Sequence, residues 1–212
     1  YPGTGYGLTE TNATCSSFTG EAFRLKPDAS GTVSPIVDIK TINENGEALS
    51  QGEIGELCIK SPTNMRGYWN PSTPNEETIR DGWVSTGDTG FVDKNGLVHV
   101  VGRIKDVIIR GGENIYPAEI EAILSTNPAV NEVAVYGIDD KAWGEIVGAT
   151  VVCGETVNAE ELQLHVRSQL ATFKVPEKIH ISKTPLERNP AGKLLLRNIK
   201  EKAIAIDNSA IS

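Results

Sequence analysis

The sequence predicts an α+β protein built from two domains. Its 212 residues are enough for one large domain or two small ones. Apolar and polar residues alternate in short segments from about residue 33 to residue 101, which is typical of antiparallel strands, whereas strand and helix patterns are mixed after Arg103. We therefore place the domain boundary within residues 103–106, where one pattern gives way to the other.

The N-terminal part is expected to form a small antiparallel β-barrel or sandwich. Strands are predicted at residues 37–42 and 55–60, where apolar and polar residues alternate. A short helix is expected at residues 76–79, before a further strand that begins at Trp83. Turns are predicted at two sites rich in Asn and Gly, residues 45–46 and 93–96.

The C-terminal part is expected to mix strands and helices. A short buried strand at residues 107–109 ends at Gly111-Gly112, and Pro117 takes the first position of a helix, where its missing N–H is not needed. Apolar residues then recur at helical spacing until Asn127-Pro128 stops the helix. The remaining elements are predicted as strands at 130–138, 146–152 and 178–182 and as helices at 159–170 and 196–204.

Composition describes an ordinary globular protein and limits its partners. Hydrophobic residues make up 39% of the chain, and no apolar run approaches the length of about 18 residues that a membrane span needs. Three scattered cysteines and three histidines lack metal-ligand spacing, so we expect a reducing, cytoplasmic location and no His/Cys metal site. The net charge of −8 argues against nucleic-acid binding. Nothing in the composition indicates an oligomeric state.

A basic segment near the C-terminus points to an anionic ligand. Residues 174–202 carry eight basic and three acidic side chains, whereas residues 1–102 carry seven basic and thirteen acidic ones. Within the basic segment, a loop with the sequence Arg-Asn-Pro-Ala-Gly-Lys presents Lys193. Such a lysine can neutralise charge on a phosphoryl group, although a lone surface lysine is more often only solvated.

Residues 6–11 contain the side chains of a nucleotide site within a Gly-rich turn. The ring of Tyr6 can stack on a purine, Gly7 permits close approach of the backbone, and the Thr9 hydroxyl can contact phosphate. The carboxylate of Glu10 suits Mg²⁺, which prefers oxygen ligands. A polar surface turn accounts for the same residues. The spacing is not that of a dinucleotide-binding glycine motif.

Two further residues have the chemistry for binding ribose. Asp88 follows a Ser-Thr-Gly turn, and its carboxylate can accept hydrogen bonds from both ribose hydroxyls. Arg103 carries a guanidinium suited to ribose or phosphate oxygens. Capping of the turn by Asp88 and a surface ion pair of Arg103 are the structural alternatives.

Together, in this order and spacing, these motifs resemble the adenylate-forming superfamily. It comprises acyl-CoA synthetases, 4-coumarate-CoA ligases, luciferases and peptide-synthetase adenylation domains. The resemblance covers nearly the whole chain, and residues 65–69 are expected to serve packing and turns rather than substrate contact. The matching segments are residues 6–10, 55–57, 65–69, 85–88, 102–106, 111–117 and 189–193.

The resemblance implies roles in binding the nucleotide. Thr9 would contact the α-phosphate, and Glu10 would hold Mg²⁺. The remaining residues expected at the nucleotide, around adenine and ribose, are Tyr6, Gly7, Asp88 and Arg103.

The resemblance also implies a small C-terminal domain that moves between two half-reactions. Lys105 would be its hinge, and Lys193 would enter the site for the first half-reaction. Gly111 and Gly112 would line a passage for the thiol of coenzyme A in the second.

The implied activity is ATP-dependent activation of a carboxylic acid, fatty or aromatic, to acyl-AMP, followed by thioester formation with coenzyme A. Residues 1–104 would then be the C-terminal part of a large AMP-binding domain with a barrel-like β subdomain, and residues 105–212 the mobile small domain. Because the family's phosphate loop and most of its acyl pocket precede the motif at Tyr6, we expect a fragment that does not complete adenylation alone. The alternatives are a peptide-synthetase adenylation domain, a luciferase-like enzyme and a non-catalytic interaction module.

Overall fold

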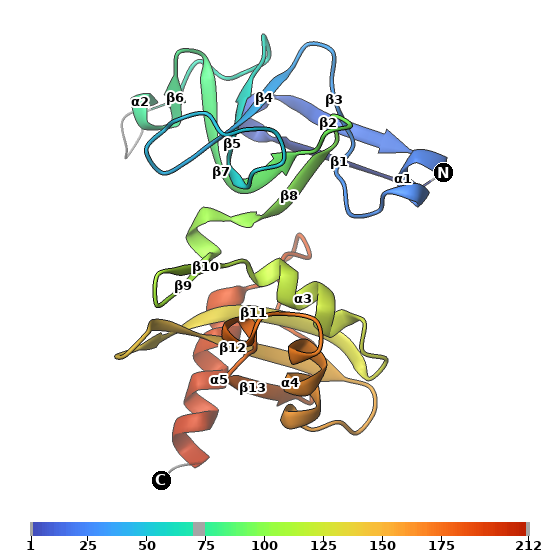
Figure 1. Cartoon of the computed structure of the whole chain (residues 1–212), viewed down its shortest axis with the longest axis vertical. Coiled ribbons are helices and arrows are strands. Elements are labelled where there is room, and N and C mark those ends of the chain that lie inside the picture. Colours follow the sequence, from blue (N-terminus) through green and yellow to red (C-terminus); the bar gives the residue numbers. More distant parts are fainter. Residues whose placement is uncertain (1, 70–74, 211–212) are drawn as a thin grey trace. The chain divides into compact units, whose positions relative to one another are not determined.

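The computed structural model describes residues 2–69 and 75–210, and the chain divides into two units at Lys105 and Asp106. Unit 1 spans Tyr1–Lys105 and unit 2 spans Asp106–Ser212 (Figure 1). The short 3₁₀ helix η2 (Ile104–Asp106) contains this division. Each unit has its own sheets and apolar core, which confirms the α+β fold class.

Unit 1 begins with a three-stranded antiparallel sheet. Its strands, in the order β1-β2-β3, are β1 (Gly3–Leu8), β2 (Ala13–Thr19) and β3 (Thr32–Val33). The 3₁₀ helix η1 (Thr9–Thr11) joins β1 to β2, and α1 (Glu21–Leu25) follows β2. The prediction of a turn over residues 6–11 was therefore wrong for its first half. Tyr6 and Leu8 alternate with glycines, and they lie half-buried on one face of a strand.

The second sheet of unit 1 has five antiparallel strands and is open. They are β4 (Asp38–Ile42), β5 (Gly55–Lys60), β6 (Ile79–Arg80), β7 (Trp83–Val92) and β8 (Val98–Arg103). Strand β5 pairs with one edge of β7, while β6 and β8 share the other edge. Within the described residues no strand pairing joins β4 to β6 or β8, so the expected barrel does not close.

The predicted strands of this sheet are confirmed, and the predicted short helix lies between β5 and β6, one residue earlier than expected. Residues 55–60 form β5 as predicted, and the turn at residues 93–96 joins β7 to β8. The expected short helix corresponds to α2 (Asn75–Thr78), and residues 71–74 before it lie outside the described residues.

Unit 2 is a mixed five-stranded sheet with helices on both faces (Figure 1). The order is β10-β9-β12-β11, with β13 parallel to β12. Val135 of β11 packs with helices α3 and α4, whereas its neighbours Ala134 and Tyr136 pack with α5. The elements are β9 (Ile108–Arg110), β10 (Glu113–Ile115), α3 (Pro117–Ser125), β11 (Val130–Asp140), β12 (Gly144–Cys153), α4 (Ala159–Arg167), η3 (Thr172–Lys174), β13 (Lys178–Ser182) and α5 (Leu196–Ala210).

Two details of unit 2 correct the prediction. The strand expected to be buried at residues 107–109 buries Ile108, but Ile109 is 55% exposed because it points to the opposite face of β9. Gly111 and Gly112, with φ of +59° and +90°, form a two-residue hairpin turn into β10, a strand that was not predicted.

None of the helices in the described residues is long and apolar enough to span a membrane.

Candidate functional site

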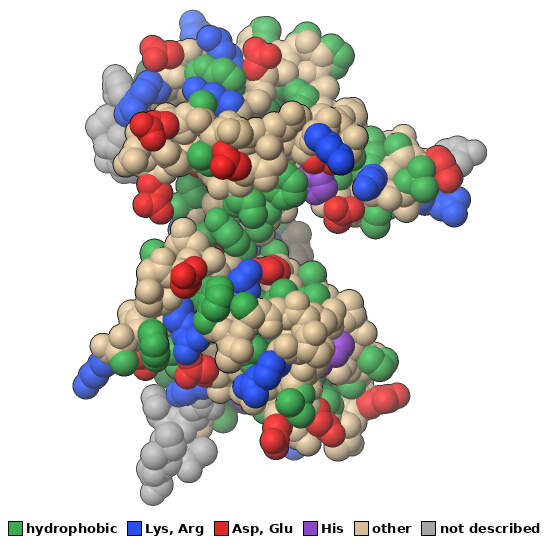
Figure 2. Space-filling model, in the orientation of Figure 1, with side chains coloured by type: hydrophobic (Ala, Val, Ile, Leu, Met, Phe, Trp, Pro, Cys, Tyr) green, Lys and Arg blue, Asp and Glu red, His purple; other side chains and the backbone are tan. Residues whose placement is uncertain are grey.

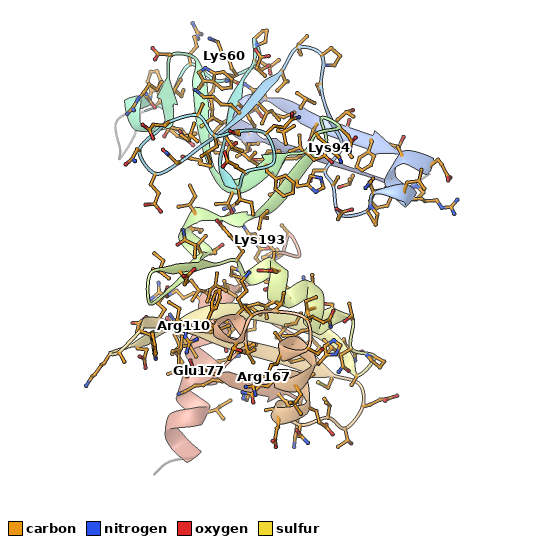
Figure 3. All side chains as sticks on the ribbon, in the orientation of Figure 1. Lys60, Lys94, Arg110, Arg167, Glu177 and Lys193 are labelled. Carbon is orange, nitrogen blue, oxygen red and sulfur yellow. The ribbon has the colours of Figure 1, made fainter. Side chains whose placement is uncertain are left out.

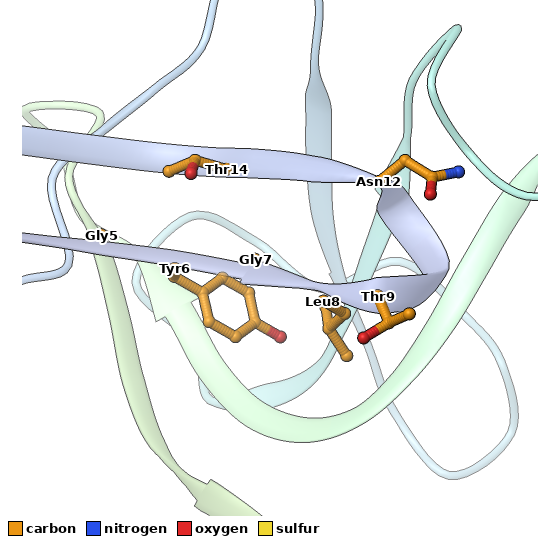
Figure 4. Close-up of a pocket in the computed structure, with 7 residues that line it drawn as sticks. All are labelled: Gly5, Tyr6, Gly7, Leu8, Thr9, Asn12 and Thr14. Atoms are coloured by element: carbon orange, nitrogen blue, oxygen red, sulfur yellow. The ribbon is translucent and has the colours of Figure 1, made fainter.

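The β1–η1–β2 hairpin of unit 1 lines a groove of about 660 Å³. Tyr6 and Leu8 pack their inner sides against a cluster around Cys15 and Ile59, which fixes the hairpin on the core. Gly5 avoids a tight contact here, because a Cβ would lie 3.0 Å from the Ser16 carbonyl oxygen. Figure 4 shows the lining residues Gly5, Tyr6, Gly7, Leu8, Thr9, Asn12 and Thr14.

The hairpin end presents Thr9 and Glu10 on a braced turn. The Thr11 hydroxyl donates to the carbonyl of Leu8 at 2.9 Å and accepts from its N–H at 3.2 Å. Asn12 adopts the left-handed conformation, with φ of 50°, and its N–H donates to the Thr9 carbonyl at 3.1 Å. The Thr9 side chain is thereby left exposed at the groove.

The sequence assigned no contact to Tyr68, yet it bonds directly to Glu10. The Tyr68 hydroxyl donates to Oε1 of Glu10 at 2.6 Å, and the Met65 N–H donates to the Glu10 carbonyl at 2.7 Å. Hydrogen bonding to the carboxylate raises the pKa of Tyr68 above its ordinary value, because a phenolate could not donate. Met65 and Tyr68 therefore orient Glu10. In the sequence, the only indication of a role for Tyr68 is that residues 65–69 match a family motif.

Asp88 is aimed by an irregularity in β7. The register between β5 and β7 shifts between Glu56 and Cys58, which leaves residues 86–88 outside the regular ladder. Gly87 has a φ of +70°, and the Thr86 hydroxyl accepts from the Asp88 N–H at 3.0 Å and donates to the Leu57 carbonyl at 2.7 Å. The turn cap at this position is made by Thr86, so the carboxylate of Asp88 is free for other partners.

The structure brings together Tyr6, Asp88 and Arg103. The Tyr6 hydroxyl donates to Oδ2 of Asp88 at 2.8 Å, and Nε of Arg103 lies 3.2 Å from Oδ1. The Asp88 side chain is 8% exposed, and the opposite position in β8 is Arg103 itself. Burial raises the pKa of Tyr6 well above its ordinary value, so it stays a neutral donor.

Glu10 fits a magnesium ion that is shared with a ligand. Within residues 2–69 and 75–210, no three His, Cys, Asp or Glu side chains converge as a metal-binding group. Mg²⁺ is usually held by one or two carboxylates together with substrate phosphates and water. A half-buried carboxylate beside the groove, with one oxygen oriented by Tyr68, meets that requirement.

The predicted residues near the division and in unit 2 lie on turns. Lys105 is exposed within η2, and Lys193 is exposed on the hairpin before α5 (Figure 3). The N–H of Gly111 donates to the Trp143 carbonyl at 2.8 Å, and a Cβ on Gly111 would approach the Trp143 ring to 3.0 Å. A side chain at Gly111 would require the Trp143 ring to shift, and the φ of +59° also favours glycine there.

The basic residues of segment 174–202 are largely neutralised. Acidic and basic side chains are interspersed on the face that Figure 2 shows. Lys193 has no ion-pair partner within the described part of the chain, so its ammonium is available to a ligand. Five basic residues of the segment form ion pairs, namely Lys174, Arg188, Arg197, Lys200 and Lys202.

Comparisons with known proteins find a family match in each of the two units. The model of the family described as AMP-binding enzyme matches residues 3–69, and that of the AMP-binding enzyme C-terminal domain matches residues 119–193. A 2-succinylbenzoate–CoA ligase of Bacillus licheniformis is 40% identical over 190 residues, which are 90% of this chain and 39% of the ligase. The fatty acid–[acyl-carrier-protein] ligase ScoC of Streptomyces coeruleorubidus is 40% identical over 203 residues, with 93% and 39% covered.

Solved structures agree as well. The o-succinylbenzoate CoA synthetase MenE of Bacillus subtilis, in complex with the acyl-adenylate OSB-AMP, matches with a TM-score of 0.84 and 37% identity. Its complex with ATP and magnesium ion matches with a TM-score of 0.83 and 36% identity. The matches cover 93% of this chain and 40% or 41% of MenE. The chain thus spans about two fifths of the length of the relatives it matches.

Proposed function

Because the chain belongs to the adenylate-forming, AMP-binding enzyme family, we propose that the protein activates a carboxylic acid with ATP and transfers the acyl group to coenzyme A. The observation that carries this proposal is the hydrogen-bonded group of Tyr6, Asp88 and Arg103 beside the groove of unit 1. Thr9 and Glu10 follow Tyr6 in η1, at the end of the same hairpin, whereas Asp88 and Arg103 come from β7 and β8.

The nucleotide is held through its base, ribose and α-phosphate. The Tyr6 ring stacks on adenine, and Asp88 accepts from the ribose hydroxyls. Each carboxylate oxygen has two lone pairs, so the bonds from Tyr6 and Arg103 leave one acceptor position on each oxygen. The exposed hydroxyl of Thr9 donates to the α-phosphate. Glu10 holds Mg²⁺, which neutralises phosphate charge when bound.

In the first half-reaction, a carboxylate oxygen of the substrate attacks the α-phosphorus of ATP. The new P–O bond gives acyl-AMP, and the bond to pyrophosphate breaks. Lys193 supplies a positive charge to the oxygens on which negative charge develops. Removing a charge-stabilising donor typically costs a factor of about 10²–10³. Unit 2 is the mobile domain that carries Lys193, with Lys105 as its hinge.

In the second half-reaction, the coenzyme A thiol gives up its proton to water, and the thiolate attacks the acyl carbonyl carbon. The thioester forms and AMP leaves with the electron pair of the broken C–O bond. Gly111 and Gly112 line the passage for the thiol, and a Cβ added at Gly112 would meet no other atom within 4 Å. The chemistry belongs to a reducing cytoplasm, which suits three cysteines that are all free thiols.

The acid is proposed to be fatty or aromatic. Two acceptors of the acyl group are considered, coenzyme A and an acyl-carrier protein. The relatives named above include a ligase for 2-succinylbenzoate and one for fatty acids. ScoC is named for an acyl-carrier protein, and its 40% identity makes transfer to a carrier protein the second candidate.

Product analysis tests the proposal. The whole protein is incubated with Mg²⁺-ATP, a panel of fatty and aromatic acids, and either coenzyme A or a phosphopantetheinylated carrier protein. Mass spectrometry is expected to find equal amounts of AMP, pyrophosphate and one acyl thioester. Formation of ADP, or of no thioester with any acid, contradicts it. A thioester on the carrier alone selects the second candidate.

A further inference from the structure

Lys193 lies on a short hairpin (Figure 3). The hairpin backbone is fixed by Asn189. The Asn189 N–H donates to the Lys193 carbonyl at 2.8 Å, and the Asn189 side-chain oxygen accepts from the Lys193 N–H at 2.9 Å. The same oxygen accepts from the Ala191 N–H at 3.0 Å. Both backbone polar groups of Lys193 are thus bonded to one residue. An exposed loop would not by itself impose this order.

The base of the hairpin is anchored in the core of unit 2. Leu186 is buried with Tyr136 and Ile199, and Leu194 packs against the same cluster. The Leu195 N–H donates to the Glu187 carbonyl at 2.9 Å, which closes the base. The base therefore moves with the sheet and α5, but these contacts do not reach the tip.

Arg188 connects the tip to the sheet. Its Nη1 donates to the Gly192 carbonyl at 3.0 Å, and its Nη2 donates to Oε2 of Glu132 on β11 at 2.9 Å. Gly192 has a φ of +82° and directly precedes Lys193. One guanidinium thus joins the residue before Lys193 to the edge strand of the sheet. A lysine, with a single ammonium, lacks the planar fork that spans two such acceptors.

We propose that Arg188, braced by Glu132, is a positioning residue that holds the backbone of Lys193 in place for acid activation. This rests on the proposed role of Lys193. The lysine side chain is long and flexible, so its ammonium reaches a defined point only if its Cα is fixed. A displacement of about 1 Å typically costs about 10²-fold in rate. Both hydrogen-bonded groups of Arg188 are engaged by Gly192 and Glu132, so we expect its effect to be confined to the half-reaction that uses Lys193.

The test measures the two half-reactions separately in the whole protein. Arg188→Gln and Glu132→Gln are expected to slow acyl-AMP formation from ATP by about 10- to 100-fold. Thioester formation from supplied acyl-AMP and coenzyme A is expected to stay unchanged. Arg188→Lys should fall between wild type and Arg188→Gln. The double variant should be no slower than Arg188→Gln, since both changes break one connection.

A matched control uses the same strand. Asp139 of β11 pairs with Lys200 at 3.6 Å, and within the described residues no hydrogen bond or ion pair joins it to the hairpin, so Asp139→Asn should leave both half-reactions unchanged. Thermal unfolding of each variant identifies loss of fold. If Arg188→Gln does not fold, the two half-reactions are compared in Glu132→Gln and Arg188→Lys instead.

Two outcomes overturn the inference. One is equal slowing of both half-reactions by Arg188→Gln and Glu132→Gln, which indicates a merely structural role. The other is normal acyl-AMP formation in both variants while Lys193→Ala abolishes it. If Lys193→Ala itself leaves acyl-AMP formation unchanged, the proposed function of Lys193 fails, and the inference fails with it for that separate reason.

Discussion

At the scale of single residues, the Asp88 carboxylate organises the site of unit 1. Tyr6 and Arg103 each approach one of its oxygens, at 2.8 and 3.2 Å, although Tyr6 lies 82 positions away in the sequence. Motif chemistry picked out all three residues. Their direct contact was not predictable, because the distance between β1 and β7 depends on packing across two sheets. The same limit hid the bond from Tyr68 to Glu10, which joins positions 58 residues apart.

Replacing Asp88 should weaken AMP binding more than replacing its partners. Asp88→Asn removes the charge that Arg103 neutralises, and hydrogen bonds to charged groups contribute about 1.5–3 kcal/mol. We expect AMP binding, measured by titration calorimetry on the whole protein, to weaken about 10- to 100-fold, and Tyr6→Phe to weaken it about 2- to 10-fold. Asp38→Asn, an exposed position on β4, is the control. Normal binding by Asp88→Asn would refute the ribose role.

The pKa of Tyr68 should report its bond to Glu10. The folded pKa is raised by this hydrogen bond, so the bond's contribution to stability is present below the ordinary tyrosine pKa of about 10. It is lost as the pH rises through the higher folded value. In Glu10→Gln we expect Tyr68 to ionise at lower pH, seen as the tyrosinate absorbance that Tyr68→Phe removes. An unchanged titration in Glu10→Gln would rule out the bond in solution.

At the scale of elements, the residue pattern predicted those strands in which apolar and polar side chains alternate between the two faces. The predicted strand at residues 55–60 matches β5, and that at 178–182 matches β13. β1 was missed because glycines occupy every second position, which removes the alternation of side chains that marks a strand. β10 was missed because it has three residues and follows a glycine turn. β1 and β10 lie beside residues with a proposed function, whereas β2 (Ala13–Thr19), which was also not predicted, pairs with β1.

The turn between β7 and β8 should depend on the charge of Asp93. Its Oδ1 accepts from the N–H groups of Leu97 and Asn95 at 2.9 and 2.8 Å. These bonds, Leu97 first, lower the pKa of Asp93 to about 2, against an ordinary value of about 4. The stabilisation is therefore present above about pH 4 and is lost as the pH falls through 2.

Denaturant unfolding between pH 5 and pH 2 checks this dependence. Asp93→Asn should show a smaller loss of stability over that interval than wild type, while Asp38→Asn should behave like wild type. An identical acid dependence in Asp93→Asn would contradict the assignment.

At the scale of the whole molecule, each unit contains its own core. Unit 2 buries Ile120, Leu124 and Leu162 against its sheet, and unit 1 buries Leu57 and Ile59 within its own. The change of residue pattern placed a boundary within residues 103–106, and the division of the structure falls there. The openness of the larger sheet in unit 1 was beyond the sequence, because barrel closure depends on whether edge strands meet.

A cavity in one core should therefore destabilise only that unit. Leu162→Ala removes a fully buried side chain from α4, which typically costs about 2–5 kcal/mol. Hydrogen exchange read by mass spectrometry should show faster exchange in peptides from residues 106–210 and unchanged exchange in those from residues 2–69 and 75–105. Equal acceleration in both sets would show that the units unfold together.

Exchange of pyrophosphate into ATP that requires a carboxylic acid substrate tests most directly whether the protein forms an acyl adenylate. The whole protein should catalyse this exchange only when its carboxylic acid substrate is present and without any thiol acceptor. Lys193→Ala should reduce the rate by about 10²–10³-fold. No exchange with any fatty or aromatic acid, or a rate unaffected by Lys193→Ala, would contradict acid activation through this site.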